Sequence, residues 1–410
     1  MTAIHNHHDT TRALTLVVCV FFLWGLSYGL LDVLNKHFQD ALHVSKAGSG
    51  LLQAAYFMAY FVIAIPAALF NQRFGYRYGL IAGLFLFAVG ALLFIPSLAM
   101  GSFHSFLGSL FLLACGAGFL ETTANPYILQ LGESDTAEKR LNLAQAFCGL
   151  GAVVGPLIGG AFIFSRAAMA TDIPDRDPVV QIYAWIAVFV VLLAVVIAKA
   201  SAMPGVAQDG KEVRDYRALL GHKRYLFGVL VQFLYVAAQV GVGAFFINYA
   251  TETSTDISSQ DAAGLLSAAM FLFMIGRFVG IYFLGFIGPS RLLAVCGLLD
   301  IILCMMVVGQ SGYLAVAALC LMFFFMSIMY PTIFSSALRD LGNKKKIGSS
   351  LLTMAVCGGA VYPLAMGYIA DHFGTATSYL LPMISFIAIF IYANVLMREK
   401  TIDRNFLAVD

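Results

Sequence analysis

The sequence predicts an all-α membrane protein with twelve transmembrane helices. Of its 410 residues, 60 % are hydrophobic and only 11 % are charged, whereas soluble domains carry about 25 % charged residues. The hydrophobic residues are also collected into runs long enough to cross a bilayer, which takes roughly 20 helical residues. The lipid bilayer is therefore the expected environment of this chain, and a nucleic-acid partner is not expected.

Each apolar run is taken as one transmembrane helix. The runs lie near residues 13–36, 48–70, 77–99, 105–131, 142–165, 179–200, 224–250, 261–286, 291–309, 313–336, 348–370 and 376–397. The longest polar connection, residues 201–223, separates the first six from the last six. We therefore expect two pseudo-symmetric six-helix bundles, residues 1–200 and 224–410, joined by a cytoplasmic linker. The first run is longer than a signal peptide and lacks a small-residue cleavage site, so no cleaved signal is expected.

Lysine and arginine fall unevenly on the two sides of these helices. One side carries nineteen of them: Arg12, Arg73, Arg77, Lys139, Arg140, Lys199, Lys211, Arg214, Arg217, Lys223, Arg224, Arg291, Arg339, Lys344, Lys345, Lys346, Arg398, Lys400 and Arg404. The other side carries four, which are Lys36, Lys46, Arg166 and Arg176, and Arg277 is intramembrane. Cytoplasmic loops carry the excess of these residues, so both termini are expected in the cytoplasm.

A weak internal repeat relates the two halves. The turn after the second helix, Asn71–Gly79, combines glycine with arginine. The segment after the eighth helix, Gly276–Gly280 followed by Gly288–Arg291, does the same. Arginines in such turns can bind exposed carbonyl groups at helix ends, and we expect both segments to lie near cytoplasmic turns.

One carboxylate, Glu121, lies inside the fourth apolar run, in the stretch Cys115–Ile128. An ionised carboxylate at membrane depth is costly, and such residues usually mark an ion or substrate pathway. We therefore predict a functional role for Glu121. The alternative is a structural glutamate paired with an interior base, for which Arg277 is the candidate. Nearby glycines and Pro126 predict a closely packed, irregular helix.

A second carboxylate, Asp32, lies in the first run. At about 1.5 Å per residue, Asp32 lies roughly 28 Å from the cytoplasmic start of its helix, and Glu121 about 24 Å from the outer start of its own. Asp32 is thus expected near the outer mouth, reachable from outside, and Glu121 around or below the midplane. Because burial favours the neutral form of a carboxyl group, the two acids are predicted to couple proton binding to alternating access. The alternative for Asp32 is a helix-end residue in water.

Neutral polar and aromatic side chains accompany these acids and are typical of a site for a sugar. Amides donate and accept hydrogen bonds at once, and aromatic faces cover the C–H patches of a sugar ring. In the seventh helix, Gln232, Tyr235 and Gln239 share one face. For any single Gln or Tyr, hydrogen bonding between helices is an equal alternative. The predicted substrate-binding residues are Trp24, Tyr28, Gln53, Glu121, Asn125, Asn142, Gln145, Gln232, Tyr235, Gln239 and Tyr330.

Other residues that could carry chemistry have a structural interpretation. Asp300 and Asp371 lack site-like polar neighbours in the sequence, so helix-end or interhelical pairing is expected for both. The seven cysteines lie in apolar runs without metal-ligand spacing and are expected to pack as small apolar residues. The sequence contains no phosphate-binding glycine loop, no Ser/His/Asp arrangement and no zinc spacing. An enzyme, a metal site and ATP-driven transport are therefore not expected.

Seven stretches together carry a family pattern. They are Phe21–Gly25 leading to Asp32, Gly118–Tyr127, Arg140–Gln145, Gln232–Gln239, Ile275–Phe278, Met326–Ser335 and Gly348–Ser350. In these stretches the chain resembles the L-fucose–proton symporter family, a branch of the major facilitator superfamily. The resemblance implies a major facilitator fold, proton-coupled import of a hexose or deoxyhexose by alternating access, a monomer and a bacterial inner-membrane location. It also implies that Asp32 and Glu121 are the proton-linked pair, with Glu121 near the sugar and Asp32 driving the conformational cycle.

The sequence departs from the L-fucose pattern near the expected site. Tyr28 and Gly29 replace an asparagine pair, and Leu31 replaces the asparagine before the helix 1 aspartate. Cys148 stands where another asparagine follows the Gln145 motif. Loss of these amides is expected to change which hydroxyl groups are recognised. Carriers of glucose/galactose or N-acetylglucosamine in the same family are therefore the alternatives.

Two wider alternatives have less support in the sequence. Sodium is a weaker candidate than the proton for the coupling ion, because sodium needs a cage of several oxygens and the intramembrane acids are few. A non-transporting sensor should carry a soluble domain or a long signalling tail, whereas only Arg398–Asp410 follow the last helix. No cofactor is expected beyond the co-transported proton.

Overall fold

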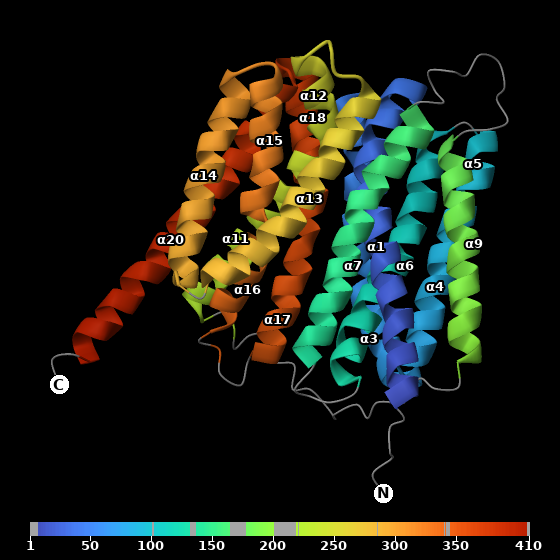
Figure 1. Ribbon diagram of the computed structural model, residues 1–410, viewed down its shortest axis with the longest axis horizontal. Coiled ribbons are helices and arrows are strands. Elements are labelled where there is room, and N and C mark those ends of the chain that lie inside the picture. Colours follow the sequence, from blue (N-terminus) through green and yellow to red (C-terminus); the bar gives the residue numbers. More distant parts are fainter. Residues whose placement is uncertain are drawn as a thin grey trace, which may run out of the picture. The chain divides into compact units, whose positions relative to one another are not determined.

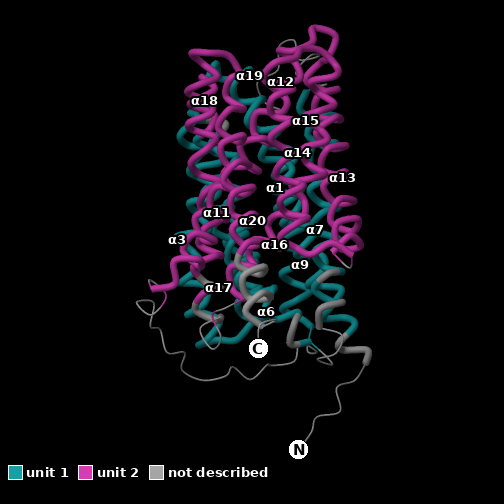
Figure 2. Tube along the Cα trace, turned by 90° about the vertical axis from the view of Figure 1, so that its left-hand side faces the viewer, with its two compact units in different colours: residues 1–44, 51–211 teal, residues 45–50, 212–410 magenta. Residues whose placement is uncertain are grey.

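In the computed structural model the described residues are almost wholly helical (Figure 1). The chain divides into two compact units, shown in two colours in Figure 2. Unit 1 comprises residues 1–44 and 51–211, and unit 2 comprises residues 45–50 and 212–410. The structure describes residues 7–100, 102–131, 137–164, 178–200, 219, 221–284, 286–339, 341 and 345–407. Most of the predicted linker lies outside these residues, so its boundaries at 201 and 223 stay a prediction.

Unit 1 is a bundle of long helices that pack side by side (Figure 1). Its α-helices are α1 (His7–Leu42), α3 (Leu51–Phe74), α4 (Tyr76–Leu92), α5 (Phe94–Met100), α6 (Phe103–Gln130), α7 (Ala137–Gly159) and α9 (Pro178–Lys199). A π-helical segment, η2 (Gly160–Phe164), continues α7. Prolines lie inside three of these helices, at Pro66, Pro126 and Pro156.

Unit 2 is a second helical bundle with more interruptions. Its elements are α2 (Lys46–Ser49), α11 (Lys223–Ala244), α12 (Phe246–Thr253), α13 (Ser259–Leu284), α14 (Pro289–Gly309), α15 (Tyr313–Met326), α16 (Met329–Leu338), α17 (Lys345–Met354), the 3-10 segment η4 (Ala355–Ala360), α18 (Tyr362–Phe373), α19 (Thr375–Ser378) and α20 (Leu380–Leu407).

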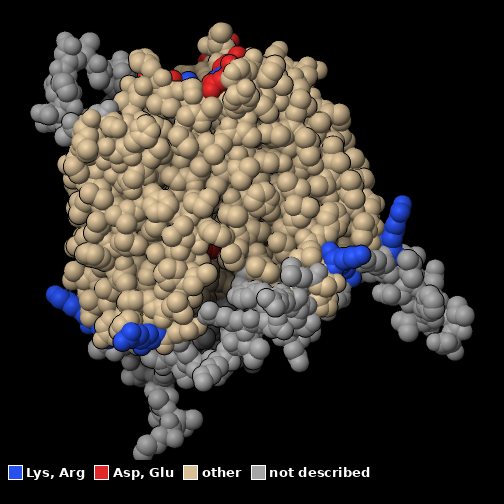
Figure 3. All heavy atoms as spheres, turned by 180° about the vertical axis from the view of Figure 1, so that it is seen from behind, with Lys and Arg blue, Asp and Glu red and all other residues tan. Residues whose placement is uncertain are grey.

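The described residues contain twelve helical segments long and apolar enough to cross a membrane. The predicted number of spans and their order along the chain are therefore confirmed. On the face shown in Figure 3, most of the surface of the described residues carries no Lys, Arg, Asp or Glu side chain, apart from a small acidic spot near its centre. A surface of this composition suits a hydrocarbon environment.

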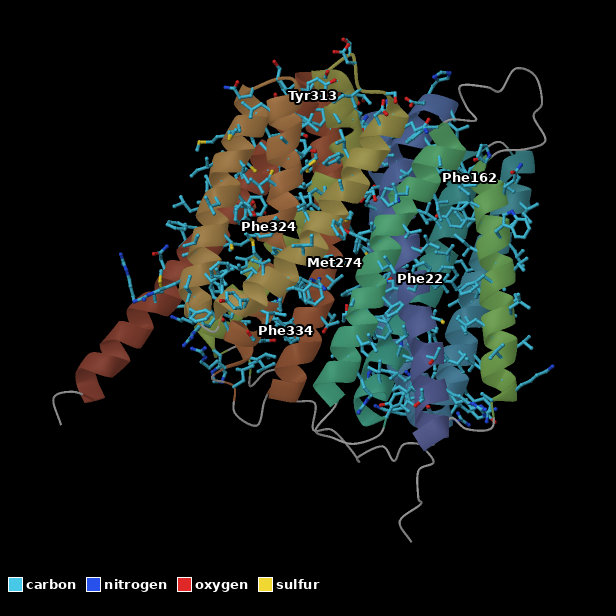
Figure 4. All side chains as sticks on the ribbon, in the orientation of Figure 1. Phe22, Phe162, Met274, Tyr313, Phe324 and Phe334 are labelled. Atoms are coloured by element: carbon cyan, nitrogen blue, oxygen red, sulfur yellow. The ribbon has the colours of Figure 1, made fainter. Side chains whose placement is uncertain are left out.

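Three spans of unit 2 are interrupted, which the unbroken apolar runs did not predict. The seventh span breaks at Phe245, the tenth breaks between α15 and α16, and the eleventh passes through η4. Figure 4 labels Phe324 and Phe334 on the two halves of the tenth span. Irregular backbone at membrane depth needs partners inside the protein. At the tenth span, the Ser327 hydroxyl donates to the Phe324 carbonyl oxygen at 2.6 Å, and the Tyr235 hydroxyl donates to the Met326 carbonyl oxygen at 2.8 Å.

Helices α1 and α7 of unit 1 pack in backbone contact, because glycines face each other along their seam. A methyl group at Gly25 would collide with the carbonyl oxygen of Cys148. One at Gly155 would lie 2.8 Å from the Cα atom of Gly29. Small residues allow such approach between membrane helices. The seam fixes the position of Trp24 and Tyr28, which precede and follow Gly25 on α1.

The two segments of the predicted internal repeat have different structures. In the first, Gly75 takes a left-handed conformation (φ 84°) between α3 and α4, and the Arg77 guanidinium donates to the Ala198 carbonyl oxygen at 2.7 Å. This confirms the expected arginine contact with a helix end. In the second, Gly276–Gly280 lie in the last third of α13 and Gly288–Arg291 begin the next helix, so the expected position near a turn is confirmed. The cytoplasmic side of that turn stays a prediction. Within α13, the missing side chain of Gly276 lets the helix approach the Phe324 carbonyl group.

Residues 45–50 belong to unit 2, although helices of unit 1 precede and follow them. The Asp371 carboxylate, near the end of α18, accepts hydrogen bonds from the backbone N–H groups of Lys46 and Ala47, each at 2.9 Å. The Lys46 ammonium lies 2.7 Å from a Glu252 carboxylate oxygen. Asp371 thus satisfies free N–H groups at the start of α2. The helix-end pairing expected for Asp371 is confirmed.

Replacing Asp371 by alanine is expected to lower the stability of the folded protein by about 1 kcal/mol, the usual effect of removing a side-chain cap. The measurement is the thermal unfolding midpoint in detergent. Asp40→Ala is the matched control, because Asp40 forms only an exposed pair with Lys36 on the same helix, at 2.9 Å. Such pairs contribute little. Equal midpoints for the two variants would contradict the capping role.

Candidate functional site

Glu121 lies deep in α6, half-buried and inside unit 1. It follows Phe103, the first residue of the helix, by about 27 Å along the axis. Within the described part of unit 1, Glu121 forms no ion pair and no hydrogen bond. The ionisable groups that interact with Glu121 electrostatically are the neutral phenols of Tyr56 and Tyr60 on α3. A carboxyl group placed in this way can bind and release a proton without breaking a salt bridge.

The two phenols of α3 that interact with Glu121 belong to a larger aromatic group of α1 and α3. The Tyr56 and Tyr60 hydroxyl groups lie 3.3 Å apart, and Tyr60 also has a polar interaction with Trp24 of α1. Tyr28, one turn after Trp24, is half-buried. Aromatic faces next to a polar group are the surface that a sugar ring requires.

Two of the predicted substrate-binding amides of unit 1 lie on α6 and α7. Asn125 follows Glu121 by one turn of α6, and its buried Oδ1 atom has no hydrogen-bond partner among the described residues. Gln145 lies half-buried on α7. The side chain of Asn142, also predicted to bind substrate, lies outside the described residues. The unpartnered Oδ1 atom of Asn125 could accept a hydrogen bond from a ligand hydroxyl.

Asp32 forms the second acidic centre of unit 1, at another depth. It lies about 15 Å from the outer end of α1 and is 2 % exposed. Gln53 of α3 lies beside the Asp32 carboxyl group. The Asp32 Oδ2 atom and the Gln53 Nε2 atom are both buried without a hydrogen-bond partner among the described residues. Gln53 accepts a hydrogen bond from Asn35 at 3.2 Å, and Asn35 accepts one from Gln39 at 2.8 Å.

This burial corrects two sequence expectations. The alternative that Asp32 is a helix-end residue in water is wrong, because α1 continues to Leu42 and covers it. The expected exposure to the outside is not present in this arrangement either. The helix extends beyond the predicted end near residue 36, where the Gln39 amide donates a hydrogen bond to the Asn35 side chain across one turn; the exposed Lys36–Asp40 pair adds little.

The predicted residues of unit 2 lie on α11 and α16. Gln232 and Tyr235 are fully buried, and Gln239 is half-buried. Neither polar atom of the Gln232 amide has a hydrogen-bond partner among the described residues. The Tyr235 hydroxyl is engaged by the Met326 carbonyl group, and its ring centre lies 6.2 Å from that of Tyr330. For Tyr235 the structure therefore favours the interhelical role that the sequence left open.

Comparison with known proteins places the chain in a family. The sequence profile of the Major Facilitator Superfamily matches residues 17–360. The chain belongs to the major facilitator superfamily. The L-fucose-proton symporter of Escherichia coli (strain K12) is 34 % identical over 400 residues, which cover 92 % of this chain and 91 % of that protein. A glucose/galactose transporter of Brucella abortus is 35 % identical over 383 residues, covering 93 % of both chains.

A solved structure agrees with these relatives. The crystal structure of the E. coli fucose:proton symporter matches with a TM-score of 0.68 at 33 % identity, over 95 % of this chain and 99 % of that one. The resemblance to the L-fucose–proton symporter family and the predicted major facilitator fold are confirmed. The predicted site residues are not tested by these matches and stay predictions.

In this superfamily member, the groups of unit 1 are suited to reversible proton binding and to neutral hydrogen bonding. One acid is half-buried among phenols, and a second is fully buried beside an amide. Among the described residues, no three His, Cys, Asp or Glu side chains are grouped to hold a metal ion. Tyr60 is a neighbour of Glu121 that the sequence prediction missed. Its spacing could have indicated it, since Gln53, Tyr56 and Tyr60 recur at three and four residues on one helix face.

A separate cavity of unit 1 has a different character. It measures about 450 Å³ and is lined almost wholly by apolar side chains of α1, α7, η2 and α9. Phe22 and Phe162, labelled in Figure 4, are two of them. None of the predicted proton-coupling or substrate-binding residues lines this cavity. A polar ligand would find few partners there, so the cavity is not the candidate sugar site.

Proposed function

We propose that this protein imports a hexose or deoxyhexose together with a proton by alternating access. One observation carries the proposal: Glu121 is a half-buried carboxyl group without an ion pair in the described part of unit 1, next to the phenols of Tyr56 and Tyr60 and one helical turn before the unpartnered Asn125 oxygen. A proton carrier and a neutral hydrogen-bonding surface are thereby combined in one bundle. The printed names of two relatives, a fucose–proton symporter and a glucose/galactose carrier, support the same class of substrate.

The proposed cycle assigns different tasks to the two acids. The protein takes up a proton from outside at Asp32. Sugar then binds near Glu121, Asn125 and Gln145, and the change of conformation releases sugar and proton inside. Burial favours the neutral form of both acids, so proton binding reduces the cost of closing the protein around them.

The same proposal includes a location and an orientation. The excess of Lys and Arg on one side, nineteen against four, supports an orientation with both termini in the cytoplasm. The bacterial inner membrane is taken from the family resemblance. The monomeric state is taken from the family resemblance and is part of the proposal.

A glucose or galactose carrier is the second candidate. It is favoured by the relative from Brucella abortus, as similar to this chain as the fucose carrier is. It is also favoured by Tyr28 and Cys148, which replace amides of the L-fucose pattern. Fewer amides would bind a different set of hydroxyl groups.

The test is uptake of radiolabelled sugar into proteoliposomes, with and without an inward proton gradient. L-Fucose, glucose, galactose and N-acetylglucosamine are compared, and protein-free liposomes and a proton-conducting uncoupler are the controls. We expect gradient-stimulated accumulation of one of these sugars, which the uncoupler abolishes. Sugar uptake down its own concentration gradient that is equal with and without the proton gradient would contradict proton coupling. Absence of uptake for all four sugars would contradict the proposed substrate class.

A further inference from the structure

The interior of unit 2 contains a carboxyl group that the proposed cycle does not use. Asp300 lies near the middle of α14, about 17 Å along the helix from Pro289. It is 0 % exposed, and neither of its carboxylate oxygens has a hydrogen-bond partner among the described residues. The helix-end or interhelical pairing that the sequence favoured for Asp300 is therefore wrong. The sequence could not indicate this, because the partners of a mid-helix acid depend on helices distant in the chain.

The ionisable groups that interact electrostatically with Asp300 are two thiols and a phenol. Cys296 and Cys304, one turn to either side on α14, and Tyr235 of α11 interact with it electrostatically. Helix α14 packs mainly on α20 and α15, and locally on α13, α16 and α19. Helix α19 has no ionisable side chain. The ionisable side chains that these other helices bury or half-bury in the described residues are Tyr392 of α20, Cys320 of α15, Tyr330 of α16 and Arg277 of α13.

Arg277 is the one positive group in this set, and it does not neutralise Asp300. Its guanidinium carbon lies 5.0 Å from the centre of the Phe273 ring, and its Nε atom is buried without a hydrogen-bond partner among the described residues. An ionised Asp300 would thus be a buried charge without donors, which costs several kcal/mol. The neutral acid is the form that this environment accommodates.

Tyr235 connects Asp300 to the broken tenth span. The Tyr235 hydroxyl is a single donor, and it is used by the carbonyl group of Met326, the last residue of α15. If the two halves of this span move and release that bond, the same O–H group becomes available to a carboxylate. Arg277 and Asp300 both interact electrostatically with Tyr235. A change of charge at Asp300 therefore acts on the hydroxyl group that binds the Met326 carbonyl at the break.

We propose that Asp300 is a proton-binding site of unit 2, separate from Asp32 and Glu121. It is a neutral carboxylic acid in this arrangement and ionises when Tyr235 releases the Met326 carbonyl group and donates to the carboxylate instead. Its use in transport rests on the proposed function. Proton binding by Asp300 does not depend on the proposed function, so the first experiment is done without any sugar.

Infrared spectroscopy of the purified full-length protein in lipid, without sugar, tests proton binding directly. The C=O stretching band of a protonated carboxylic acid is compared at neutral pH between the wild type and Asp300→Asn. We expect the variant to lose one such band. The control variants Asp32→Asn and Glu121→Gln should keep the band that Asp300→Asn loses. That difference assigns the band to the Asp300 carboxyl group. An unchanged carboxylic-acid region in Asp300→Asn would show that Asp300 is ionised and would overturn the proposal.

Two further variants separate proton binding from a structural role. In Tyr235→Phe, which has no hydroxyl donor, the Asp300 band should persist to higher pH than in the wild type; identical titration would overturn the role of Tyr235. Asp300→Leu removes an unsatisfied polar group from the interior and should leave the thermal unfolding midpoint unchanged or raise it. A strong fall of the midpoint in both Asp300→Leu and Asp300→Asn would show a structural anion and contradict the proposal.

Transport by the same variants tests whether the site is used. If the wild type accumulates sugar with a proton gradient, Asp300→Asn is expected to shift the pH dependence of that accumulation. An unchanged pH profile would contradict the link to transport, while the infrared band decides proton binding on its own. Failure of the wild type to transport would count against the proposed function and would leave the infrared result standing.

Discussion

Glu121→Gln is expected to abolish proton-driven accumulation of sugar while the protein stays folded. Glutamine keeps the size and the hydrogen-bonding capacity of the side chain, but it cannot bind and release a proton. Within the described part of unit 1 Glu121 has no ion pair, so its neutralisation strands no opposite charge. The measurement is gradient-driven uptake into proteoliposomes, with the thermal unfolding midpoint as the check on folding.

Sugar binding by the same variant can be followed separately. The chain has two tryptophans, and Trp185 on α9 is 75 % exposed, far more than the half-buried Trp24. In a Trp185→Phe background, Trp24 alone reports binding through its fluorescence. A neutral amide is a weaker hydrogen-bond acceptor than a carboxylate, so the substitution should weaken sugar affinity by about tenfold, and the pH dependence of sugar affinity that arises from Glu121 should disappear. Full gradient-driven accumulation in Glu121→Gln would show that the assigned role is wrong.

The sequence was sufficient for the twelve spans because membrane helices are encoded locally, as continuous apolar runs. It was also sufficient to single out Glu121, because one carboxylate in a long apolar run stands out without knowledge of its neighbours. The depth estimate for Asp32 failed for the opposite reason. The polar residues after position 36 read as a loop, and only the Asn35–Gln39 bond and the Lys36–Asp40 pair show that they continue α1.

Long-range contacts account for the rest of what the sequence could not predict. Residues 45–50 pack within unit 2 because their backbone N–H groups are bound by Asp371, more than 300 positions away in the chain. The break in the tenth span depends on a hydroxyl group from α11 that replaces a missing helical partner. Neither contact leaves a periodic signal in the sequence. The same holds for Asp300, whose lack of partners appears only when the surrounding helices are in place.

Asp32→Asn is expected to separate sugar exchange from net transport. Asparagine is isosteric with aspartate, and the hydrogen bonds among Asn35, Gln53 and Gln39 do not involve Asp32, so this region should stay intact. The variant should keep sugar counterflow, in which labelled and unlabelled sugar exchange across the membrane, because exchange needs binding and reorientation but no net proton movement. It should lose accumulation against a sugar gradient, because the acid assigned to proton uptake can no longer titrate.

Comparison of Asp32→Asn with Glu121→Gln tests the division of tasks between the two acids. If Asp32 drives the cycle and Glu121 lies near the sugar, only Glu121→Gln should weaken sugar binding, whereas both should lose accumulation. Asp40→Asn is the matched control on α1, because Asp40 is exposed and paired with Lys36; it should transport like the wild type. Wild-type accumulation by Asp32→Asn would remove Asp32 from the mechanism. An equal loss of counterflow in both acid variants would instead mean that the two carboxyl groups act as one coupled site.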